Sequence, residues 1–519
     1  MGEVRKLHKK LRQIENLEIK PFLTQEEREK ISRKVELRSR LAELLLQLSA
    51  PQQGQGTVGD EKERMKRQVE DSLEVVVSQS PPAKVPRESS DRVPSQRREV
   101  APGYPAESQT GTSEPQEDPK HNCLRASWEG ARFRLRLLEG HSDIVTCVVA
   151  VDNLVISGSR DTTVKVWHVP TASEQRNLGG HSGGITGLLA PLPEYCRRLA
   201  KSLSLNEREQ FVLSGSVDCT IKIWALSSGC CVKSIYTFNA ISALCFVPDG
   251  EGLIVTGSDG GKVEVWSWDT MENCQSIKAH EDSVTSLQSH GPLLFSGSAE
   301  GGVSVWEAQC SRAAPLRMLH QWSSAVTGCG RQNGATVSQL TLSPRGDRVF
   351  LANGRASLKI LNWRTGSVSK VANHSSVAGV TDCVSQTGGV LIGSCFDLAT
   401  GESTLNLFSL PLCKYLVSLT CPEYPRILCF TGWLTASGCH RWVTGGRALT
   451  VWEQLPANGK QRGDVTAKRN SQLEASLEES GTDTEEDSDG KTDSCSASHT
   501  TDLSNYPCSK MSDTPLPGR

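Results

Sequence analysis

The chain has 519 residues, and its 57 Lys and Arg nearly balance 59 Asp and Glu, giving a formal net charge of −2 at pH 7. This balance excludes a global basic field that would draw the whole chain to nucleic acid. The 18 cysteines form no C-x-x-C pair and no cluster with metal-ligand spacing, so we expect no metal, no cofactor and no disulfide framework.

Several cysteines fall at predicted strand positions, which favours buried free thiols in a reducing compartment: Cys147, Cys219, Cys245 and Cys329. The first residues, MGEVRKLHKK, lack the apolar core of a signal peptide. No stretch reaches the roughly 18 apolar residues that span a bilayer. We therefore expect a protein of the cytoplasm, the nucleus or both, without membrane contact.

Residues 1–48 are predicted to form a basic helical hairpin. Apolar residues repeat at spacings of three and four before Pro21, namely Val4, Leu7, Leu11, Ile14 and Leu17. Thr24 and Glu27 then make a capping box that opens a second helix. Its apolar residues are expected to face one side: Ile31, Val35, Leu41, Leu44, Leu45 and Leu48.

This hairpin carries 12 Lys and Arg against 8 Asp and Glu, with the excess in Arg5, Lys6, Lys9, Lys10 and Arg12. The runs KKLRQIENLE and LTQEEREKISRKVELRSRLAEL resemble short helical segments of RNA- and ribosome-associated proteins. Three interpretations stay open: a solvated helix face, a docking helix for a partner protein, or a contact with RNA or the ribosome.

Residues 49–127 are rich in Pro, Gln, Ser and charge. Such low hydrophobicity cannot offset the entropy lost on ordering a chain. We therefore predict a disordered linker between the hairpin and the next domain.

From residue 128 to 456 a phrase recurs in which a small polar turn leads into an alternating strand and then tryptophan. It occurs as SGSRDTTVKVW, SGSVDCTIKIW, TGSDGGKVEVW and SGSAEGGVSVW, which end at Trp167, Trp224, Trp266 and Trp306. Alternation of β-branched and polar residues is typical of strands, and a unit of roughly 40–45 residues is typical of one propeller blade. The first interval is longer because residues 191–210 form a polar insert, predicted to be a loop with a helical turn.

These repeats resemble the WD40-repeat family. The resemblance implies an all-β, seven-bladed β-propeller, in which His, Ser or Thr, Asp and Trp of a blade form a hydrogen-bonded relay. The residues given this structural role are His141, Ser157, Asp161, Trp167, His181, Ser214, Asp218, Trp224, His280, Trp266, Trp306 and Trp452. A relay of this kind would satisfy the buried indole and imidazole nitrogens.

The later blades depart from the motif. The third has Asn239 and Ala240 where Gly-His would fall, and the fourth has Glu300 in place of the Asp. Periodicity alone places Leu361 and Phe408 at the tryptophan positions of the fifth and sixth blades, with Arg355 at the Asp position and His374 as a loop histidine.

Closure of the ring is predicted to use a segment from outside the repeats. After Trp452 only residues 453–456 remain before the chain turns polar, so the last blade lacks an outer strand. The alternating segment 131–137 has no blade of its own. We expect it to complete the seventh blade, because an open ring would expose unpaired strand edges.

Residues 457–519 are predicted to be a disordered acidic tail. Ser476, Ser480, Thr482 and Thr484 each have an acidic residue three places on, which resembles the consensus of casein kinase 2. We therefore predict that these four residues are phosphorylated. There are two alternatives: the tail only aids solubility, or it folds back on the basic hairpin.

No nucleotide-binding glycine loop, nucleophile elbow or metalloprotease helix occurs, so we expect no enzyme. The resemblance implies instead a scaffold that binds proteins through loops on one face of the ring. Candidate partner-binding residues are Arg160, Asn239, Asp259, Glu281, Trp322, Arg355 and Arg447. Trp322 is favoured because it is expected in a loop, with no strand to pack in. The alternative is an RNA- or ribosome-associated factor that docks through residues 1–48.

Overall fold

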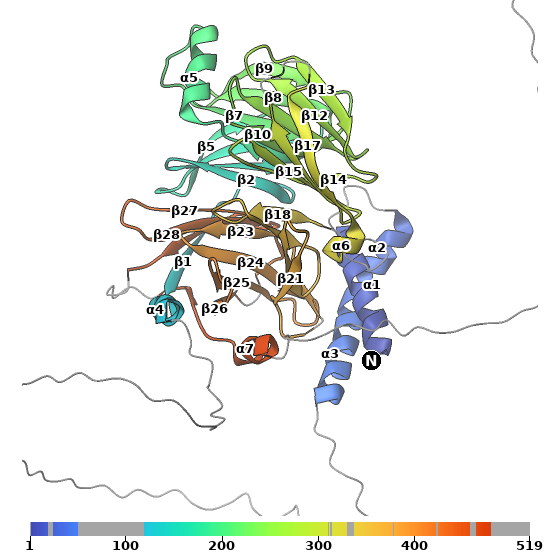
Figure 1. Cartoon of the computed structure of the whole chain (residues 1–519). Coiled ribbons are helices and arrows are strands. Elements are labelled where there is room, and N and C mark those ends of the chain that lie inside the picture. Colours follow the sequence, from blue (N-terminus) through green and yellow to red (C-terminus); the bar gives the residue numbers. More distant parts are fainter. Residues whose placement is uncertain are drawn as a thin grey trace, which may run out of the picture. The chain divides into compact units, whose positions relative to one another are not determined.

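The structure is a computed structural model that describes residues 2–18, 24–49, 119–309, 311, 314–329, 337–376, 378–421, 424–456 and 463–478. In these residues the strands form seven antiparallel sheets. The first strands of successive sheets contact one another in the order β2, β6, β10, β14, β18, β23 and β27, and β27 returns to β2. The sheets are therefore the blades of a closed ring, and the predicted seven-bladed propeller is confirmed (Figure 1).

The first four blades have four strands each. Blade one contains β2 (Val145–Val151), β3 (Leu154–Ser159), β4 (Val164–His168) and β5 (Ser173–Leu178). Blade two contains β6 (Ile185–Leu189), β7 (Phe211–Ser216), β8 (Thr220–Ala225) and β9 (Cys231–Tyr236). Blade three contains β10 (Ile241–Val247), β11 (Leu253–Ser258), β12 (Lys262–Ser267) and β13 (Asn273–Lys278). Blade four contains β14 (Val284–His290), β15 (Leu293–Ser298), β16 (Val303–Ala308) and β17 (Leu316–Trp322).

Blade five contains β18 (Gln339–Leu342), β19 (Arg348–Ala352), β20 (Ser357–Asn362) and β21 (Val368–Ala372). Blade six contains β22 (Gly379–Val380), β23 (Val384–Thr387), β24 (Val390–Asp397), β25 (Ser403–Ser409) and β26 (Tyr415–Cys421). In blade six both β22 and β23 pair with β24, so its inner edge is interrupted.

Blade seven is built from both ends of the ring. Its strands are β27 (Ile427–Leu434), β28 (His440–Gly446), β29 (Thr450–Gln454), β1 (Arg132–Leu137) and β30 (Val465–Thr466), in that order across the sheet. β1 pairs with β29 and aligns Leu135 with Trp452. Closure by an N-terminal strand is thus confirmed.

The blades follow from their sequence pattern. Val164 and Val166 of β4 are fully buried, as are the equivalent Ile221 and Ile223 of β8, so alternate residues of these strands pack between sheets. The tight turns require unusual backbone conformations. At Gly261 φ is +74°, and a Cβ there would lie 2.1 Å from the carbonyl oxygen of His280, so only glycine fits.

Two segments predicted to be disordered are ordered in part. In the predicted linker, α4 (Pro119–Trp128) buries Trp128 against Phe133 and Trp442. In the predicted tail, β30 pairs with β1, and α7 (Ser471–Glu478) buries Leu473. The domain boundaries at 127 and 456 are therefore corrected. These polar segments bury a few apolar side chains against the ring, and these contacts order α4, β30 and α7.

The insert in blade two also differs from its prediction. Instead of a loop with one helical turn, it contains α5 (Pro193–Ser202), which buries Tyr195, Cys196, Leu199 and Ala200 against the neighbouring blade core. The short helix α6 (Ser324–Thr327) follows blade four.

In the part of the chain that the structure describes, no helix combines the length and the apolar character needed to cross a membrane.

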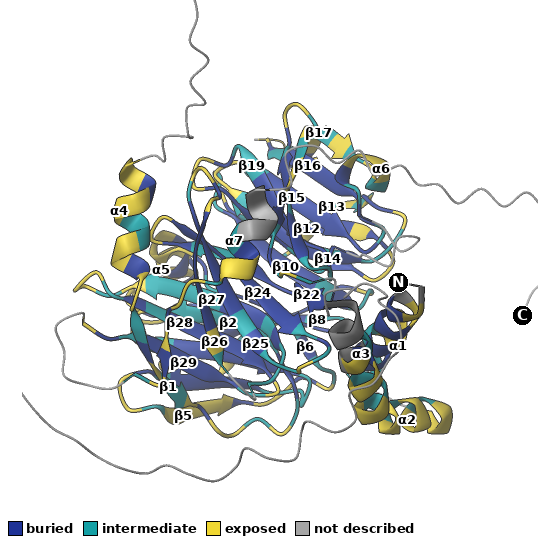
Figure 2. Ribbon diagram, turned by 90° about the horizontal axis from the view of Figure 1, so that it is seen from below, coloured by how far each residue is buried: buried dark blue, intermediate teal, exposed yellow. Residues whose placement is uncertain are grey.

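Three helices form the N-terminal region: α1 (Gly2–Glu18), α2 (Gln25–Ser32) and α3 (Lys34–Ser49). Thr24 and Glu27 form the capping box of α2, with hydrogen bonds of 2.8 and 3.3 Å. The second predicted helix is divided at Arg33, and Val35 is exposed rather than part of an apolar face. α1 packs along α3, whereas α2 buries no side chain (Figure 2).

Candidate interaction surface

One face of the ring carries the loops that precede the first strand of each blade and the turns between its second and third strands. These segments share a face because successive strands are antiparallel. We call this face the loop face. Most of the candidate residues lie on these loops and turns.

Beneath the loop face, blades one and two each contain a hydrogen-bonded relay. In blade one, His141 Nδ1 lies 2.8 Å from Asp161 Oδ2 and His141 Nε2 lies 2.7 Å from Ser157 Oγ, which also accepts from the indole N–H of Trp167 at 2.8 Å. Because the carboxylate can only accept, Nδ1 carries the hydrogen and Nε2 accepts from the serine hydroxyl. The structure therefore brings these four predicted residues together.

Blade two repeats the relay with nearly identical geometry. His181 lies 2.8 Å from Asp218 and 2.7 Å from Ser214, and the indole of Trp224 donates to Ser214 at 2.8 Å.

Blades three, four and seven keep parts of this relay. In blade four His280 and Trp306 share Ser296, at 2.8 and 3.1 Å, and Glu300 stands 3.5 Å from His280. Trp266 and Trp452 donate to Thr256 and Thr444, at 3.4 and 2.9 Å.

Burial sets the charge state of these histidines. It lowers the pKa of His141 and His181 despite the opposing effect of the aspartates, and it lowers the pKa of His280 despite Glu300. In blade six burial also acts to lower the pKa of His374, but its hydrogen bond and ion pair with Asp397, at 3.2 Å, outweigh burial and raise the pKa. The imidazoles of blades one, two and four are therefore neutral hydrogen-bonding groups at pH 7.

Four candidate residues lie on blades one, three and four. Arg160 makes a two-pronged ion pair with Asp143, at 2.9 and 2.8 Å. Asn239 turns inward and donates to Glu264 at 3.1 Å. Asp259 is exposed and accepts from Ser283 at 3.2 Å, and Glu281 is exposed beside Lys278. Asp259 and Glu281 are therefore the most accessible of the four.

Trp322 does not lie in a loop, and that expectation is corrected. It is the last residue of β17 and pairs with Val303. Its indole N–H donates to the carbonyl of Trp363 at 2.9 Å, and its ring stacks on His320 with centroids 5.9 Å apart. The strand continues two residues past His320, so this aromatic ring has neighbours to pack against.

Arg355 and Arg447 lie next to the N-terminal helices. The Nη2 atom of Arg447 is 3.3 Å from Glu18 Oε2 of α1. Burial, together with the positive charges of Arg355 and Arg426, lowers the pKa of Arg12, so this residue of α1 faces the same part of the ring. Arg447 is thus engaged by the chain's own N-terminus, and Arg355 lies near Arg12 of the same helix.

An exposed aromatic patch on the loop face was missed by sequence reasoning. Val217, Tyr236 and Phe238 are 46, 56 and 79% exposed, and the rings of Tyr236 and Phe238 meet edge to face with centroids 4.8 Å apart. The N–H of Thr237 donates to the carbonyl of Cys219 at 2.9 Å, which holds the loop beside the turn that carries Val217. We call these three residues the aromatic patch.

The backbone at Phe238 is strained. Its φ is +61°, a conformation that costs a bulky residue about 1–3 kcal/mol. His141, His181 and His280 each stand four residues before the first residue of an inner strand, and the equivalent place before Ile241 is Thr237, so Phe238 directly follows the histidine position and not Gly-His at 239–240 as expected. Asn239 is the residue of this loop that turns inward. The missing Gly-His motif was the sequence signal, but it gave no indication of which side chain would point outward.

The N-terminal helices contact the ring through an apolar cluster. Val4, Leu7 and Leu11 of α1 and Leu41 of α3 pack with three residues of blade six, Val380, Phe396 and Leu398. These contacts lie inside one compact unit, Met1–Leu477. The apolar stripe predicted on α1 is therefore directed at the ring.

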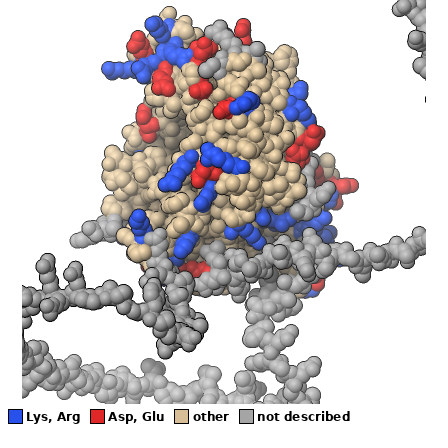
Figure 3. Space-filling model, in the orientation of Figure 1, with Lys and Arg blue, Asp and Glu red and all other residues tan. Residues whose placement is uncertain are grey.

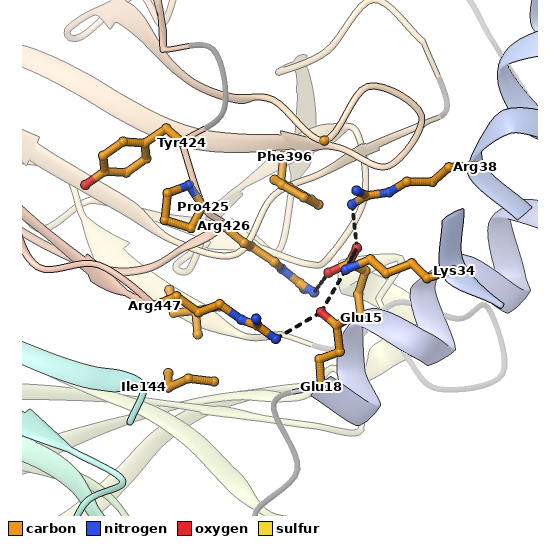
Figure 4. Close-up of a pocket in the computed structure, with 12 residues that line it drawn as sticks. Glu15, Glu18, Lys34, Arg38, Ile144, Phe396, Tyr424, Pro425, Arg426 and Arg447 are labelled. Atoms are coloured by element: carbon orange, nitrogen blue, oxygen red, sulfur yellow. Dashed lines mark hydrogen bonds and ion pairs between the residues drawn. The ribbon is translucent and has the colours of Figure 1, made fainter. Parts of the chain in front are cut away.

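Charged residues of α1, α3 and the ring lie beside Phe396 of this apolar contact (Figure 4). Glu15 binds Lys34 and Arg38 of α3, each at 2.8 Å, and its other oxygen lies 4.0 Å from Arg426 of the ring. Arg426 is held by Asp382 through bonds of 2.6 and 2.7 Å. A cavity of about 220 Å³ opens between α1, α3 and these ring residues.

Elsewhere the charge on the surface is dispersed. On the side seen in Figure 3, basic and acidic residues alternate in small groups, one of them around α5 at the top, and much of the surface is uncharged. Of the four predicted phosphorylation sites, Ser476 lies in α7, and Ser480, Thr482 and Thr484 lie outside the described residues, as do all of residues 479–519 of the tail that was expected to fold back.

A family model described as WD domain, G-beta repeat matches residues 133–168, 172–225, 229–267 and 271–307. These matches cover β1 and the strands from β2 to β16, and the structure continues the ring with β17 of blade four and with blades five to seven.

Curated relatives share the ring sequence at low identity. Pre-mRNA-processing factor 19 homolog 2 of Arabidopsis thaliana is 25% identical over 53% of this chain and 48% of its own length. Small ribosomal subunit protein RACK1y of Oryza sativa subsp. japonica is 28% identical over 33% of this chain and 49% of its own length. Mitochondrial division protein 1 of Aspergillus clavatus is 27% identical over 34% of this chain and 23% of its own length. The chain thus spans about half or less of each.

Proposed function

We propose that this chain, a WD40-repeat β-propeller protein, is a non-enzymatic scaffold that binds partner proteins through its loop face. WD40 propellers generally serve as platforms for protein interaction. The relatives named above carry unrelated descriptions, in pre-mRNA processing, the ribosome and mitochondrial division, so they favour a shared binding platform rather than a shared reaction.

The aromatic patch is the observation that carries this proposal. Exposed aromatic side chains on a rigid ring bury much apolar area on binding and lose little conformational entropy, which is why they dominate interaction hot spots. Phe238 is 79% exposed, and its backbone has a positive φ. Asp259 and Glu281, also exposed on the loop face, would then contribute to the polar rim of the contact.

Quantitative capture of partners from cell extract tests the proposal with three forms of the full chain: wild type, Phe238→Ser and Leu412→Ser. Leu412 is 51% exposed in the turn between β25 and β26 of blade six, on the opposite face, and is the matched control. We expect Phe238→Ser to lose specific protein partners at least tenfold and Leu412→Ser to keep them. Equal capture by all three forms would exclude the patch as the binding site.

A second candidate function rests on the exposed lysines of α1. Lys6, Lys9 and Lys10 are exposed on α1, whose apolar residues face the ring. This arrangement suits a contact with RNA or a ribosome, and one relative is described as a ribosomal subunit protein. The cytoplasmic or nuclear location expected from the sequence is compatible with both candidates and stays a prediction.

Charge reversal separates the two candidates. A Lys6→Glu, Lys9→Glu, Lys10→Glu variant should release nuclease-sensitive partners if α1 binds RNA, and should change nothing if only the loop face binds. Arg197→Glu, Lys201→Glu on α5 reverses two other exposed basic side chains and is the control. Loss of RNA from both variants would indicate nonspecific charge attraction.

A further inference from the structure

The ring surface beneath α1 combines apolar and cationic side chains. Val380, Phe396 and Leu398 supply the apolar part. Arg426 and Arg447 lie beside it and direct their guanidinium groups toward α1 (Figure 4). We call these five residues the arginine-lined surface.

α1 matches this surface in both respects. Leu7, Leu11, Glu15 and Glu18 follow one another at spacings of four, four and three, so they lie along one face of the helix. The leucines pack in the apolar cluster, and the two glutamates reach the arginines one turn further on. The arginine-lined surface therefore binds a helix face on which apolar side chains are followed, about one turn later, by two carboxylates.

The fit of α1 is incomplete at Arg426. Its Nε and Nη2 atoms bind Asp382, whereas Nη1 is buried and, among the described residues, has no hydrogen-bond acceptor. The nearest carboxylate oxygen, Glu15 Oε2, is 4.0 Å away, and the adjoining cavity measures about 220 Å³. A helix that placed a carboxylate nearer would gain a charge-assisted hydrogen bond that α1 does not make.

α1 supplies no strand to the ring. None of the seven sheets contains a residue of α1, and the apolar cluster at α1 is separate from the clusters between blades, as far as the structure describes them. Residues 50–118 separate α3 from α4 in the chain. A helix that left the surface would stay attached to the ring through this stretch of chain.

We propose that the arginine-lined surface binds an acidic amphipathic helix of a partner protein in exchange for α1. The pattern recognised is Leu-x-x-x-Leu-x-x-x-Glu-x-x-Glu, as in residues 7–18. This goes beyond the scaffold function proposed above, because the arginine-lined surface and the aromatic patch share no residue. Failure of either proposal leaves the other standing.

A labelled helix added in trans tests the exchange. The probes are a synthetic peptide of residues 1–49 and a designed helix that keeps only the four pattern positions in an Ala, Gln and Lys background. Fluorescence anisotropy would measure their binding to the wild-type full chain and to Leu7→Asp, Leu11→Asp. In the wild type the tethered α1 competes at an effective concentration of about 1 mM. Leu7→Asp, Leu11→Asp should release α1 from the surface, and we call such a protein an opened variant. We therefore expect both probes to bind it at least tenfold more tightly than they bind the wild type.

Charge variants identify the surface. Glu15→Arg, Glu18→Arg opens the full chain by changing charges only, and should also bind the probes more tightly than the wild type. In the opened chain, Arg447→Glu should weaken the 1–49 peptide, and Glu18→Arg in that peptide should restore binding. The matched control is Arg345→Glu, on an exposed turn of blade five on the opposite face. Equal binding to wild type and opened variants, no binding to either, or no charge rescue would overturn the proposal.

Discussion

At the residue scale, the ring depends on buried polar side chains that satisfy one another. Ser157 is the centre of the blade-one relay, because its hydroxyl bonds to both His141 and the indole of Trp167. Ser157 is fully buried, so no water can replace it without repacking. The same arrangement recurs at Ser214 and Ser296.

Replacing Ser157 by Ala should lower the free energy of unfolding by about 2–4 kcal/mol, because two buried polar atoms lose their partner. Ser142→Ala is the control: its side chain is exposed, and its backbone N–H bond to Asp161 survives the change. Urea unfolding measures both variants. Losses of similar size would show that the relay contributes no more than an exposed hydroxyl.

His440 gives the fold a pH dependence. Burial lowers its pKa to about 4, while in the unfolded chain it titrates near the ordinary value of about 6.5. Between these values the unfolded chain takes up a proton that the folded chain does not, so stability falls as pH falls. The contribution from pH 7 to pH 5 is about 2 kcal/mol.

A His440→Gln variant should therefore lose about 2 kcal/mol less than the wild type between pH 7 and pH 5. Urea unfolding at the two pH values, with both proteins in parallel, gives this difference. Parallel pH profiles would contradict the assignment to His440.

At the element scale, β1 closes the ring. Phe133 is fully buried and packs on Trp442, with ring centroids 4.6 Å apart. Without this strand, the edge of β29 would be unpaired. The sequence indicated this role, because residues 131–137 alternate and no blade strand follows the short segment after Trp452.

Phe133→Ala should destabilise the ring by about 3–5 kcal/mol, through a cavity at the closing sheet. Leu137→Ala, on the same strand but 51% exposed, should change stability by less than about 0.5 kcal/mol. Thermal and urea unfolding compare them. Similar values would mean that the strand closes the ring through its backbone alone.

Other elements could not be predicted from the sequence. α4, β30 and α7 lie in polar segments that each bury only a few side chains, such as Trp128, Val465 and Leu473, so no period marks them. The relays of blades one and two were predictable because Ser, Asp and Trp recur at the same spacings in both blades, although the distance in sequence from His to Ser differs. The pairing of Glu18 with Arg447 was not, because residues so far apart in the sequence leave no local pattern.

At the scale of the whole molecule, the loop face has two regions with different surroundings. Over blades six and seven, α1 covers the arginine-lined surface. The aromatic patch, between blades two and three, consists of exposed side chains. Sequence reasoning placed candidate contacts all around the face and gave no reason to separate Arg447, which pairs with α1, from Asp259, which stays accessible.

The most direct test of the scaffold function is photo-crosslinking in cells. A benzophenone amino acid would replace Phe238 on the loop face or Leu412 on the opposite face, and adducts would be identified by mass spectrometry. The account predicts defined protein adducts from position 238 and none from position 412. Adducts from position 412 alone, or from neither position, would contradict it.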